Sequence, residues 1–522
     1  MEHEEGIVRL AKPVRKGLLH LVFSRFFLIL LLLLLQLLLL VGVYVYCTEK
    51  LPLLIKLQSV FTFAMVVYLF NSGMDSSVKL TWMFIISLLP LPGAVLLLFT
   101  QANVGHRMEK RLVEQQIEDS RGLLSQRPEV PEALAHDGSG TDDLCRYLNR
   151  SGCFPLYDRT ELRYFPSGEI CLGAMLEELE KAEKSIFLEF FIVEEGYMWG
   201  RVLEVLTRKA AAGVEVRMLY DGMCEMSTLP VNYWKLLEAQ GIHAKPFSPI
   251  RPAVSSHYNY RDHRKILVID GRVAFTGGVN LADEYINRVE RFGHWKDAAL
   301  LLRGEAAQSF ALMFLQMWYI GAEEADYRSW LGSGAGPAAG EGYVLPFADS
   351  PLDRDKVGES VYMDILNRST DYVHIMTPYL VLDDELETAL CFAARRGVEV
   401  KLILPGIPDK RLPYALAKTH YRALTEAGVQ LYEYTPGFVH AKVFVSDACK
   451  AVVGTINLDY RSLYHHFECA AYLYRTPCIA AIEADFRQTL EQCRPVTAET
   501  IKNEKLSIKL LGGLAKFLAP LL

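Results

Sequence analysis

The chain has 522 residues, with 55 Lys and Arg against 62 Asp and Glu, so it is too long for a single hydrophobic core and should form two or three folded units. Its formal charge of −7 gives no overall positive field, which argues against a protein that holds nucleic acid by bulk electrostatics. The 10 cysteines form no C-x-x-C pair, which excludes a zinc ribbon or a thioredoxin motif.

The N-terminal region predicts membrane helices. Residues 26–46 form an uncharged apolar run that is long enough to span a bilayer, and no small-residue cleavage site follows to indicate a signal peptide. Residues 80–100 predict another span, whereas residues 60–70 give a weaker one because Lys56 precedes them. We therefore expect two or three spans within residues 26–103. Basic residues flank both ends of this region and leave its orientation open.

Two later segments resemble each other and indicate an internal repeat. KSIFLEFFIVEE from Lys184 is echoed by DYVHIMTPYLVL from Asp371, and each leads into an amphipathic helix and then Gly-Val-Glu-Val. This β–α–β order predicts two α/β lobes with a mixed or parallel sheet. The expected organisation is a basic tail (1–25), a transmembrane region (26–103), a helical connector (104–155), a first lobe (156–330), a glycine-rich linker (331–345), a second lobe (346–500) and an amphipathic C-terminal tail (501–522).

Each half carries the motif H-x-K-x-x-x-x-D, and two matches at equivalent repeat positions are not explained by chance. The residues after each histidine are apolar and β-branched, so His and Lys at positions i and i+2 should project from the same face of a strand. The candidate catalytic residues are His263, Lys265 and Asp270 in the first half and His440, Lys442 and Asp447 in the second.

A glycine-bearing loop follows each motif, in VAFTGGVN and in AVVGTIN. Glycine lets the backbone approach a ligand closely, and the asparagine amide adds a donor. Two sets of His, Lys and Asn suit a phosphodiester, because Lys and Asn can bind its non-bridging oxygens while two imidazoles act on opposite sides of phosphorus. This set requires no metal or other cofactor. The loop residues expected to contact substrate are Gly278, Asn280, Thr455 and Asn457.

Other histidines lack this support. His243 and Lys245 repeat the H-x-K spacing, but Ile250 stands where the aspartate should be and no glycine loop follows at the right distance. His465 and His466 belong to neither motif, so we expect no functional role for them.

With these motifs the chain resembles the phospholipase D superfamily, whose signature is H-x-K-x-x-x-x-D with a downstream G-x-x-N in each half. Within it, the chain is similar to the bacterial cardiolipin synthases in GHWKDAALLLRG, TPYLVLDDEL and VGTINLDYRSLYHHFE. The resemblance implies a two-lobed αβ sandwich with its active site at a pseudo-twofold interface. It also implies that Glu468, and with less support Asp297, assist the histidines. One departure is Gly277-Gly278, where Gly-Ser is commoner in the superfamily.

The family resemblance further implies a multi-pass enzyme of the bacterial cell membrane, which joins two phosphatidylglycerol molecules into cardiolipin and releases glycerol. Its partners would be membrane lipids and not nucleic acid, and the sequence does not indicate an oligomeric state. Near neutral pH one imidazole can be neutral while the other is held protonated by a carboxylate. We expect His263, provisionally, to attack phosphorus and His440 to protonate glycerol, although the near symmetry leaves these roles exchangeable. A hydrolase with the same chemistry and a non-catalytic lipid-binding scaffold are the alternatives.

Overall fold

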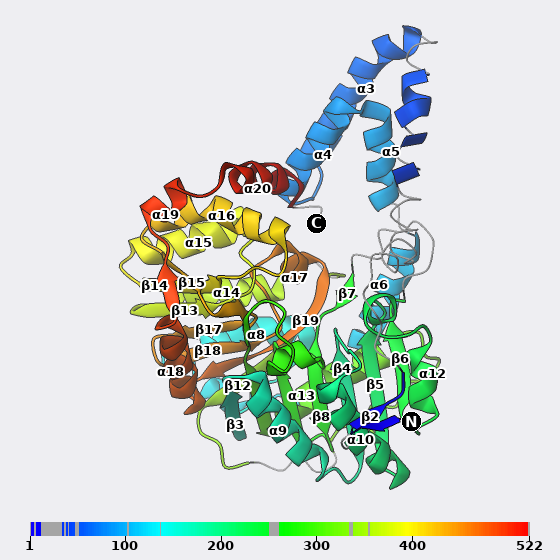
Figure 1. Cartoon of the computed structure of the whole chain (residues 1–522), viewed down its shortest axis with the longest axis vertical. Coiled ribbons are helices and arrows are strands. Elements are labelled where there is room, and N and C mark those ends of the chain that lie inside the picture. The colour runs from blue at the N-terminus through cyan, green and yellow to red at the C-terminus, as the bar shows by residue number, and fades with distance from the viewer. Residues whose placement is uncertain are drawn as a thin grey trace.

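Two β-sheet lobes form the body of the molecule, and a group of apolar helices projects from it (Figure 1). The N-terminal strands β1 and β2 form a hairpin on this body, and β2 packs on a helix of the first lobe. The computed structural model describes residues 2–4, 7–11, 34–35, 38–39, 41–46, 52–101, 104–135, 137–249, 260–332, 338–352 and 355–519. The hairpin strands are β1 (Glu2–Glu4) and β2 (Ile7–Arg9).

The projecting helices differ from the expected spans. The expected span at residues 80–100 is two shorter helices, because Pro90 has no backbone N–H to continue the first and instead begins the second. None of the helices in the described part of the chain is long and apolar enough to cross a membrane. Most of the expected span at residues 26–46 lies outside the described residues. The projecting helices are α3 (Pro52–Phe70), α4 (Ser76–Leu88) and α5 (Pro90–Gln101), and α6 (Val104–Asp119) follows them.

The first lobe contains a mixed seven-stranded sheet in the order β3-β11-β9-β8-β4-β5-β6. Its central strands are rich in Val, Ile, Leu and Phe and are buried on both faces, as expected for a sheet covered by helices on both sides. The strands are β3 (Thr160–Phe165), β4 (Ser185–Phe190), β5 (Glu215–Asp221), β6 (His243–Phe247), β8 (Lys265–Ile269), β9 (Val273–Gly277) and β11 (Ala299–Gly304).

The second lobe repeats this strand order as β12-β19-β18-β17-β13-β14-β15, with β20 added at its edge. The internal repeat predicted two similar lobes, and the matching strand order confirms it. The strands are β12 (Tyr343–Asp349), β13 (Tyr372–Met376), β14 (Glu399–Pro405), β15 (Gln430–Tyr434), β17 (Val443–Ser446), β18 (Lys450–Gly454), β19 (His466–Tyr474) and β20 (Cys493–Pro495).

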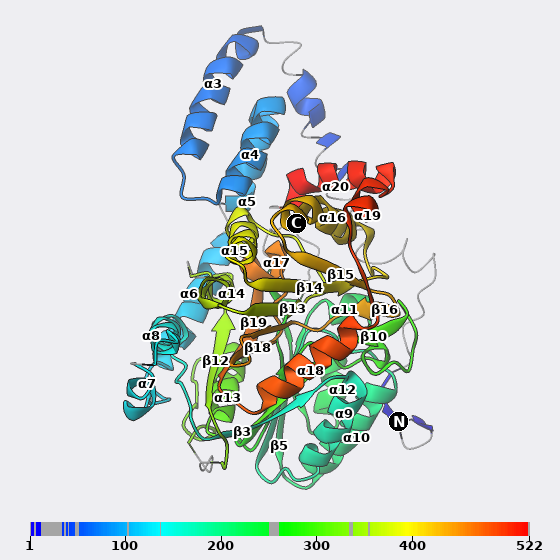
Figure 2. The ribbon, with the colours of Figure 1, turned by 90° about the vertical axis from the view of Figure 1, so that its left-hand side faces the viewer.

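The two sheets enclose a shared core. Helix α13 contacts β4, β8 and β9 of its own lobe and also β12, while α18 contacts strands of the second lobe and also β3. Figure 2 shows α18 crossing the middle of the molecule, with the outer helices of each lobe farther out. One apolar cluster accordingly includes Phe310, Phe314 and Phe486 together with strand residues of both lobes. The two inner helices are α13 (Ala307–Trp318) and α18 (Cys478–Leu490).

The outer helices cover the far faces of the two sheets and complete a separate core in each lobe. Asp383 caps one of these helices by accepting a hydrogen bond from the backbone N–H of Leu386. The first-lobe helices are α9 (Gly168–Leu179), α10 (Tyr197–Ala211), α11 (Cys224–Ser227), α12 (Tyr233–Glu238) and the 3₁₀ turn η2 (Asp283–Ile286). Those of the second lobe are α14 (Val357–Arg368), α15 (Asp384–Arg395), α16 (Arg411–Glu426) and α17 (Tyr460–Tyr464), and α7 (Glu129–Glu132) and α8 (Thr141–Gly152) precede the first sheet.

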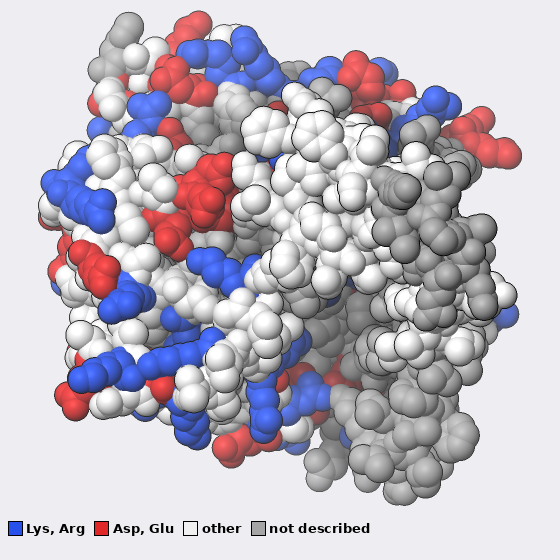
Figure 3. Space-filling view, turned by 90° about the horizontal axis from the view of Figure 1, so that it is seen from above, with Lys and Arg blue, Asp and Glu red and all other residues white. Residues whose placement is uncertain are grey.

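The C-terminal helix packs at the base of the projecting helices (Figure 1). Gly512 lies so close to α16 that a Cβ added there would be 2.4 Å from the carbonyl oxygen of Ala415. Phe517 contacts α4 through the ring of Phe84, with the ring centroids 4.7 Å apart. Seen from above, this end of the molecule has a broad area without charged side chains (Figure 3). The C-terminal elements are α19 (Ala498–Lys502) and α20 (Leu506–Leu518).

Candidate active site

The two H-x-K motifs lie at equivalent places in the two sheets. His263 and Lys265 stand at the start of β8, and His440 and Lys442 precede β17. All four residues are buried, between 2 and 7% exposed. As the strand pattern predicted, histidine and lysine share a face, since Nζ of Lys442 lies 2.9 Å from Nε2 of His440.

Short parallel strand pairs bind each motif to the opposite lobe. Strand β7 leads into His263 and pairs with β19 of the second lobe, while β10 of the first lobe pairs with β16, which leads into His440. The backbone N–H of His263 donates to the carbonyl of Phe467 at 3.0 Å, and that of His440 donates to the carbonyl of Lys296 at 2.7 Å. These pairs bring the two motifs together at the lobe interface. The strands are β7 (Arg261–Asp262), β10 (His294–Lys296) and β16 (Gly437–Val439).

Each motif histidine is paired with a buried carboxylate of the other lobe. Nδ1 of His263 lies 2.8 Å from Oε1 of Glu468, and Nδ1 of His440 lies 2.8 Å from Oδ2 of Asp297. Both acids have an exposed fraction of 0%. A carboxylate at Nδ1 orients the ring and leaves Nε2 as the nitrogen that can react.

The four basic groups of the motifs influence one another electrostatically across the interface. Burial, followed by the charges of Lys265, His466 and Lys442, holds the pKa of His263 well below its ordinary value. Burial and the charge of Lys442 lower the pKa of His440 to about 4. In the protein alone, burial and the charges of the lysines thus lower the pKa of both imidazoles and oppose the effect of the carboxylates.

The two lysines and the two acids also have shifted pKa values. Burial lowers the pKa of Lys265 to about 8 and that of Lys442 to about 7. Burial raises the pKa of Glu468 well above its ordinary value. Burial also acts to raise the pKa of Asp297, but the charge of His440 and its hydrogen bond outweigh that effect and hold the pKa low. A negatively charged ligand would favour the protonated lysines, so the site is suited to an anion.

The glycine loops support the carboxylates. A Cβ on Gly278 would lie 2.0 Å from Oδ1 of Asp297, so this glycine makes room for the acid that holds His440. At the equivalent position of the second half, the hydroxyl of Thr455 donates to Glu468 and accepts from the backbone N–H of Cys469. The departure from Gly-Ser in the first loop thus has a steric reason.

The two loop asparagines differ in their contacts. Nδ2 of Asn280 donates to the hydroxyl of Tyr285 at 2.8 Å, and its Oδ1 accepts from the backbone N–H of Ile192 at 3.0 Å. Oδ1 of Asn457 has no hydrogen-bond partner among the described residues. The first amide is therefore occupied by the protein at both ends, whereas the oxygen of the second has no partner in the described part of the chain.

The motif aspartates lie at the opposite ends of their strands from the histidines. Seven residues of extended chain separate each Asp from its His, which corresponds to about 20 Å. Asp270 accepts three backbone N–H groups at the start of β4, at 2.7 to 2.9 Å, and Asp447 accepts three at the start of β13, at 2.8 to 3.0 Å. Both have a left-handed backbone, with φ of 53° and 52°. In the structure they hold turns and do not contact the histidines.

The additional H-x-K segment at His243 and Lys245 is separate from this site. His243 begins β6, which is separated from β8 by β4 and β5 in the first sheet. Its side chain is 54% exposed and lies 3.3 Å from Glu238. The ammonium group of Lys245 lies over the ring of Trp318.

His466 is a neighbour that the sequence did not predict. Its ring centroid is 5.3 Å from that of His263, and donor atoms of His263, His466 and Glu468 all lie within 4.8 Å of one another. In chain order His466 stands two residues before Glu468, as Trp295 stands two residues before Asp297. This repeat relationship was the signal that could have identified it.

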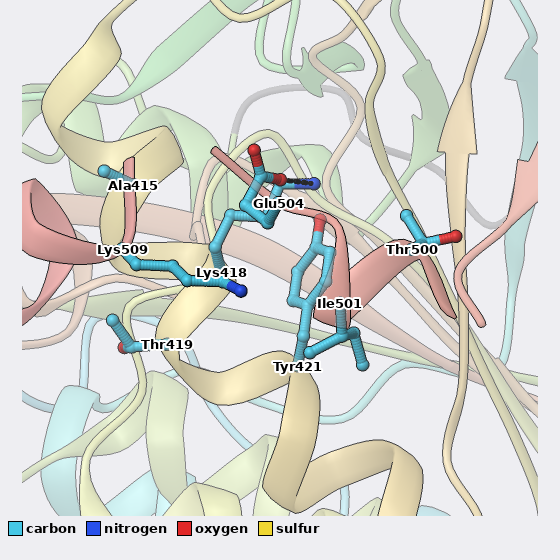
Figure 4. A pocket seen from close by; sticks show the side chains of 8 residues that line it. All are labelled: Ala415, Lys418, Thr419, Tyr421, Thr500, Ile501, Glu504 and Lys509. Atoms are coloured by element: carbon cyan, nitrogen blue, oxygen red, sulfur yellow. Dashed lines mark ion pairs between the residues drawn. The ribbon is translucent and has the colours of Figure 1, made fainter. Parts of the chain in front are cut away.

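A separate pocket of about 220 Å³ lies between α16, α19 and α20 (Figure 4). Lys418 points into it but is paired with Glu433 and, at 3.2 Å, with Glu504. None of the predicted site residues lines this pocket.

Comparisons with known proteins agree with this geometry. The family described as "Cardiolipin synthase, PLD-like domain" matches residues 175–318 and 362–490, one segment in each lobe. An uncharacterized protein of Streptococcus mutans is 54% identical over 88% of this chain and 99% of its own length. A cardiolipin synthase of Alkalihalophilus pseudofirmus is 33% identical over 89% of this chain and 94% of its own length. Among solved structures, phosphatidylserine synthase of Haemophilus influenzae has the same fold, with a TM-score of 0.55, 15% identity, and coverage of 73% of this chain and 97% of the other.

Proposed function

The chain belongs to the cardiolipin synthase family with phospholipase D-like domains and is a phosphatidyltransferase, and we propose that it transfers a phosphatidyl group from one phosphatidylglycerol to another, giving cardiolipin and glycerol. The observation that carries this proposal is the reciprocal pairing of His263 with Glu468 and of His440 with Asp297 across the lobe interface. It provides two oriented imidazoles at one site, as a reaction in two displacement steps requires.

In the first step, Nε2 of one histidine, provisionally His263, attacks phosphorus. The bond from phosphorus to the glycerol oxygen breaks, and His440 gives its proton to that oxygen. His440 has a low pKa in the protein alone, and the phosphate charge raises it when the lipid binds. The products of this step are free glycerol and a phosphatidyl group bound to His263.

In the second step, the free hydroxyl of another phosphatidylglycerol attacks the same phosphorus. His440 takes the proton of this hydroxyl, the bond from phosphorus to His263 breaks, and cardiolipin leaves. This step returns the proton to His440 and frees His263 for the next cycle. Near symmetry of the two pairs makes the reverse assignment of the histidines chemically equivalent.

The remaining motif residues bind and position. Lys265 and Lys442 hold the non-bridging oxygens, where negative charge increases in the transition state, with Asn457 as a further donor. Asn280 and Gly278 act mainly by shaping the first loop, and Thr455 supports Glu468. Asp270 and Asp447 act as positioning residues, because their contacts fix the strands that carry the motifs.

The substrate and the location are proposed on the same basis. The projecting helices expose many apolar side chains, including Phe63 and Leu88, and such a surface suits contact with a lipid bilayer. We place the enzyme at the cell membrane, where its lipid substrates are found. Close packing of the site against lipid would favour an alcohol over water as acceptor.

The test is to incubate the purified protein with phosphatidylglycerol as the sole lipid and to measure cardiolipin, free glycerol and phosphatidic acid. The proposal requires cardiolipin and glycerol in equal amounts. Phosphatidic acid as the main product would identify a hydrolase, and no conversion of lipid would indicate a binding protein.

A further inference from the structure

His466 is a buried polar residue that the proposed mechanism does not use. It lies at the start of β19 and is 7% exposed. The ring of Phe191 contacts both His263 and His466, with centroid distances of 4.9 and 6.2 Å. Neither ring nitrogen of His466 has a hydrogen-bond partner in the described part of the chain, and its Nδ1 is 3.8 Å from Glu468, which is too far for a hydrogen bond. Buried polar groups are nearly always hydrogen-bonded, so this imidazole calls for an explanation.

The pseudo-twofold relationship places Trp295 at the equivalent position of the other half. Trp295 lies opposite Phe438 in the β10–β16 pair, and His466 lies opposite Arg261 in the β19–β7 pair, each two residue pairs before the level of the His–carboxylate pair. The ring centroid of His466 lies 5.3 Å from that of His263, and the ring centroid of Trp295 lies 5.3 Å from that of His440. The indole N–H of Trp295 donates to Asp297 at 3.3 Å, so it has a partner within the protein. His466 has the same place without such a partner.

The surroundings of His466 suit an anionic ligand. Burial, and then the positive charges of Arg461, His465, Lys265 and Arg261, hold its pKa well below the ordinary value. The ring is therefore neutral near pH 7 and offers one N–H donor. The nearest acid is Glu468, which is engaged by His263 and Thr455, and burial raises its pKa well above the ordinary value.

The two sides of the site also differ in their amides. Asn280, in the first-half loop, is occupied by Tyr285 and Ile192, whereas Asn457 keeps its Oδ1 without a partner in the described residues. The amide N–H of Asn280 is thus engaged by Tyr285 in the half that carries His263, the same histidine that His466 accompanies.

We propose that His466 is a third histidine of the active site, whose neutral N–H donates a hydrogen bond to a non-bridging oxygen of the phosphodiester held beside His263. This proposal rests on the proposed function only in requiring a phosphodiester substrate. It holds equally for transfer to an alcohol and for transfer to water, because both pass through the same attack on phosphorus.

Two substitutions separate hydrogen bonding from packing. His466→Phe keeps an aromatic ring against His263 and Phe191 but has no donor, whereas His466→Asn loses the ring and keeps an N–H group. His465→Asn is the matched control for the loss of a neighbouring imidazole, because the ring of His465 packs beside Tyr260. The full-length protein is assayed for glycerol released from phosphatidylglycerol vesicles, which counts every turnover whatever lipid is formed. Inhibition by orthovanadate, a mimic of five-coordinate phosphorus, is measured alongside.

We expect His466→Phe to lower kcat for glycerol release by about 100-fold and to weaken vanadate inhibition by about tenfold, the effect of losing one oriented donor. His466→Asn should stay within about fivefold of the unmodified protein in both, and His465→Asn within about twofold. The reverse order, with Phe active and Asn inactive, would assign His466 to packing and overturn the proposal. Equal activity of all three variants, or loss of glycerol release in both His466 variants without a change in vanadate inhibition, would also overturn it. Phosphatidic acid from the unmodified protein would overturn the proposed acceptor but leave this comparison intact.

Discussion

His263 and Glu468 are 205 positions apart in the chain, come from different lobes, and lie with Nδ1 2.8 Å from Oε1 at the interface of the two sheets. His440 and Asp297 form the reciprocal pair, 143 positions apart and also at 2.8 Å. Each lobe therefore supplies one histidine of its own motif and the carboxylate for the histidine of the other. Neither lobe alone contains a complete His–carboxylate pair of this kind, so the active site depends on the interface.

This pairing predicts the effect of changing the acids. Glu468→Gln and Asp297→Asn should each lower kcat by about 100-fold or more with little change in KM, because the ring loses the carboxylate that sets its tautomer and orientation. Steady-state assays on phosphatidylglycerol vesicles check this. The matched control is Glu238→Gln, which removes the carboxylate from the exposed pair with His243 and should leave kcat unchanged. Wild-type kcat in both interface variants would contradict the proposed role of the pairs.

The two motif histidines should be essential for activity, whereas His243 should not. We expect His263→Ala and His440→Ala each to abolish cardiolipin formation, since the two imidazoles serve one reaction cycle and neither can replace the other. His243→Ala should retain most of the activity, because that side chain is exposed on a different strand. Product analysis and a thermal unfolding curve for each variant check this. Damage from His243→Ala equal to that from His440→Ala would refute our choice between the motifs.

The reaction should proceed in excess chelator. Lys265 and Lys442 supply the positive charge that a metal ion provides in other phosphoryl-transfer sites. A metal held by His263, His466 and Glu468 would occupy the histidine that we expect to attack phosphorus. Cardiolipin formation is measured with and without the chelator after dialysis. Complete loss, with rescue by one particular divalent ion, would require a different mechanism.

The two lysines predict a dependence of KM on pH. Burial lowers the pKa of Lys442 to about 7 and that of Lys265 to about 8, so above these values the free protein lacks protons that it must take up when it binds the phosphate. KM should rise about tenfold per pH unit between pH 7 and 8 and more steeply above pH 8. Lys442→Arg retains its charge over this range and should reduce the slope of log KM against pH by about one unit, despite a lower kcat. Parallel profiles for the two proteins would contradict this prediction.

Helix α20 should contact the membrane. Its outer face carries Leu506, Leu510 and Leu514, which are 70, 61 and 72% exposed, while its other face packs on α16 and α4. Changing the three leucines to serine should lower activity on vesicles by about tenfold or more and leave activity in detergent micelles nearly unchanged. Leu236→Ser on α12 controls for the loss of an exposed leucine elsewhere. Equal activity on vesicles before and after the triple change would remove this role.

Much of the architecture could be predicted from the sequence because it is encoded in local patterns. The apolar, β-branched residues after each H-x-K, the glycine loops and the repeated Gly-Val-Glu-Val predicted two similar α/β lobes, and the structure has the same strand order in both. The same patterns distinguished His263 and His440 from His243. Only the first two are followed by an apolar run that ends in an aspartate and then by a second run that ends in a glycine loop. Apolar length predicted a single span at residues 80–100, but Pro90 divides it, because a proline cannot donate the hydrogen bond that would continue a helix.

Only the tertiary structure decided which groups meet. The repeat pattern of each half is local, whereas the contact of His263 with Glu468 arises when β7 pairs with β19 of the other lobe, and no local pattern specifies that pairing. The aspartates of the two motifs lie at the far ends of their strands for a related reason, since seven residues of extended chain carry them away from the histidines. His466 likewise meets His263 only through the packing of the lobes, although its place two residues before Glu468 repeats that of Trp295 before Asp297. Sequence thus determined the chemical groups and the strands that present them, and the packing of one lobe on the other determined their partners and their protonation.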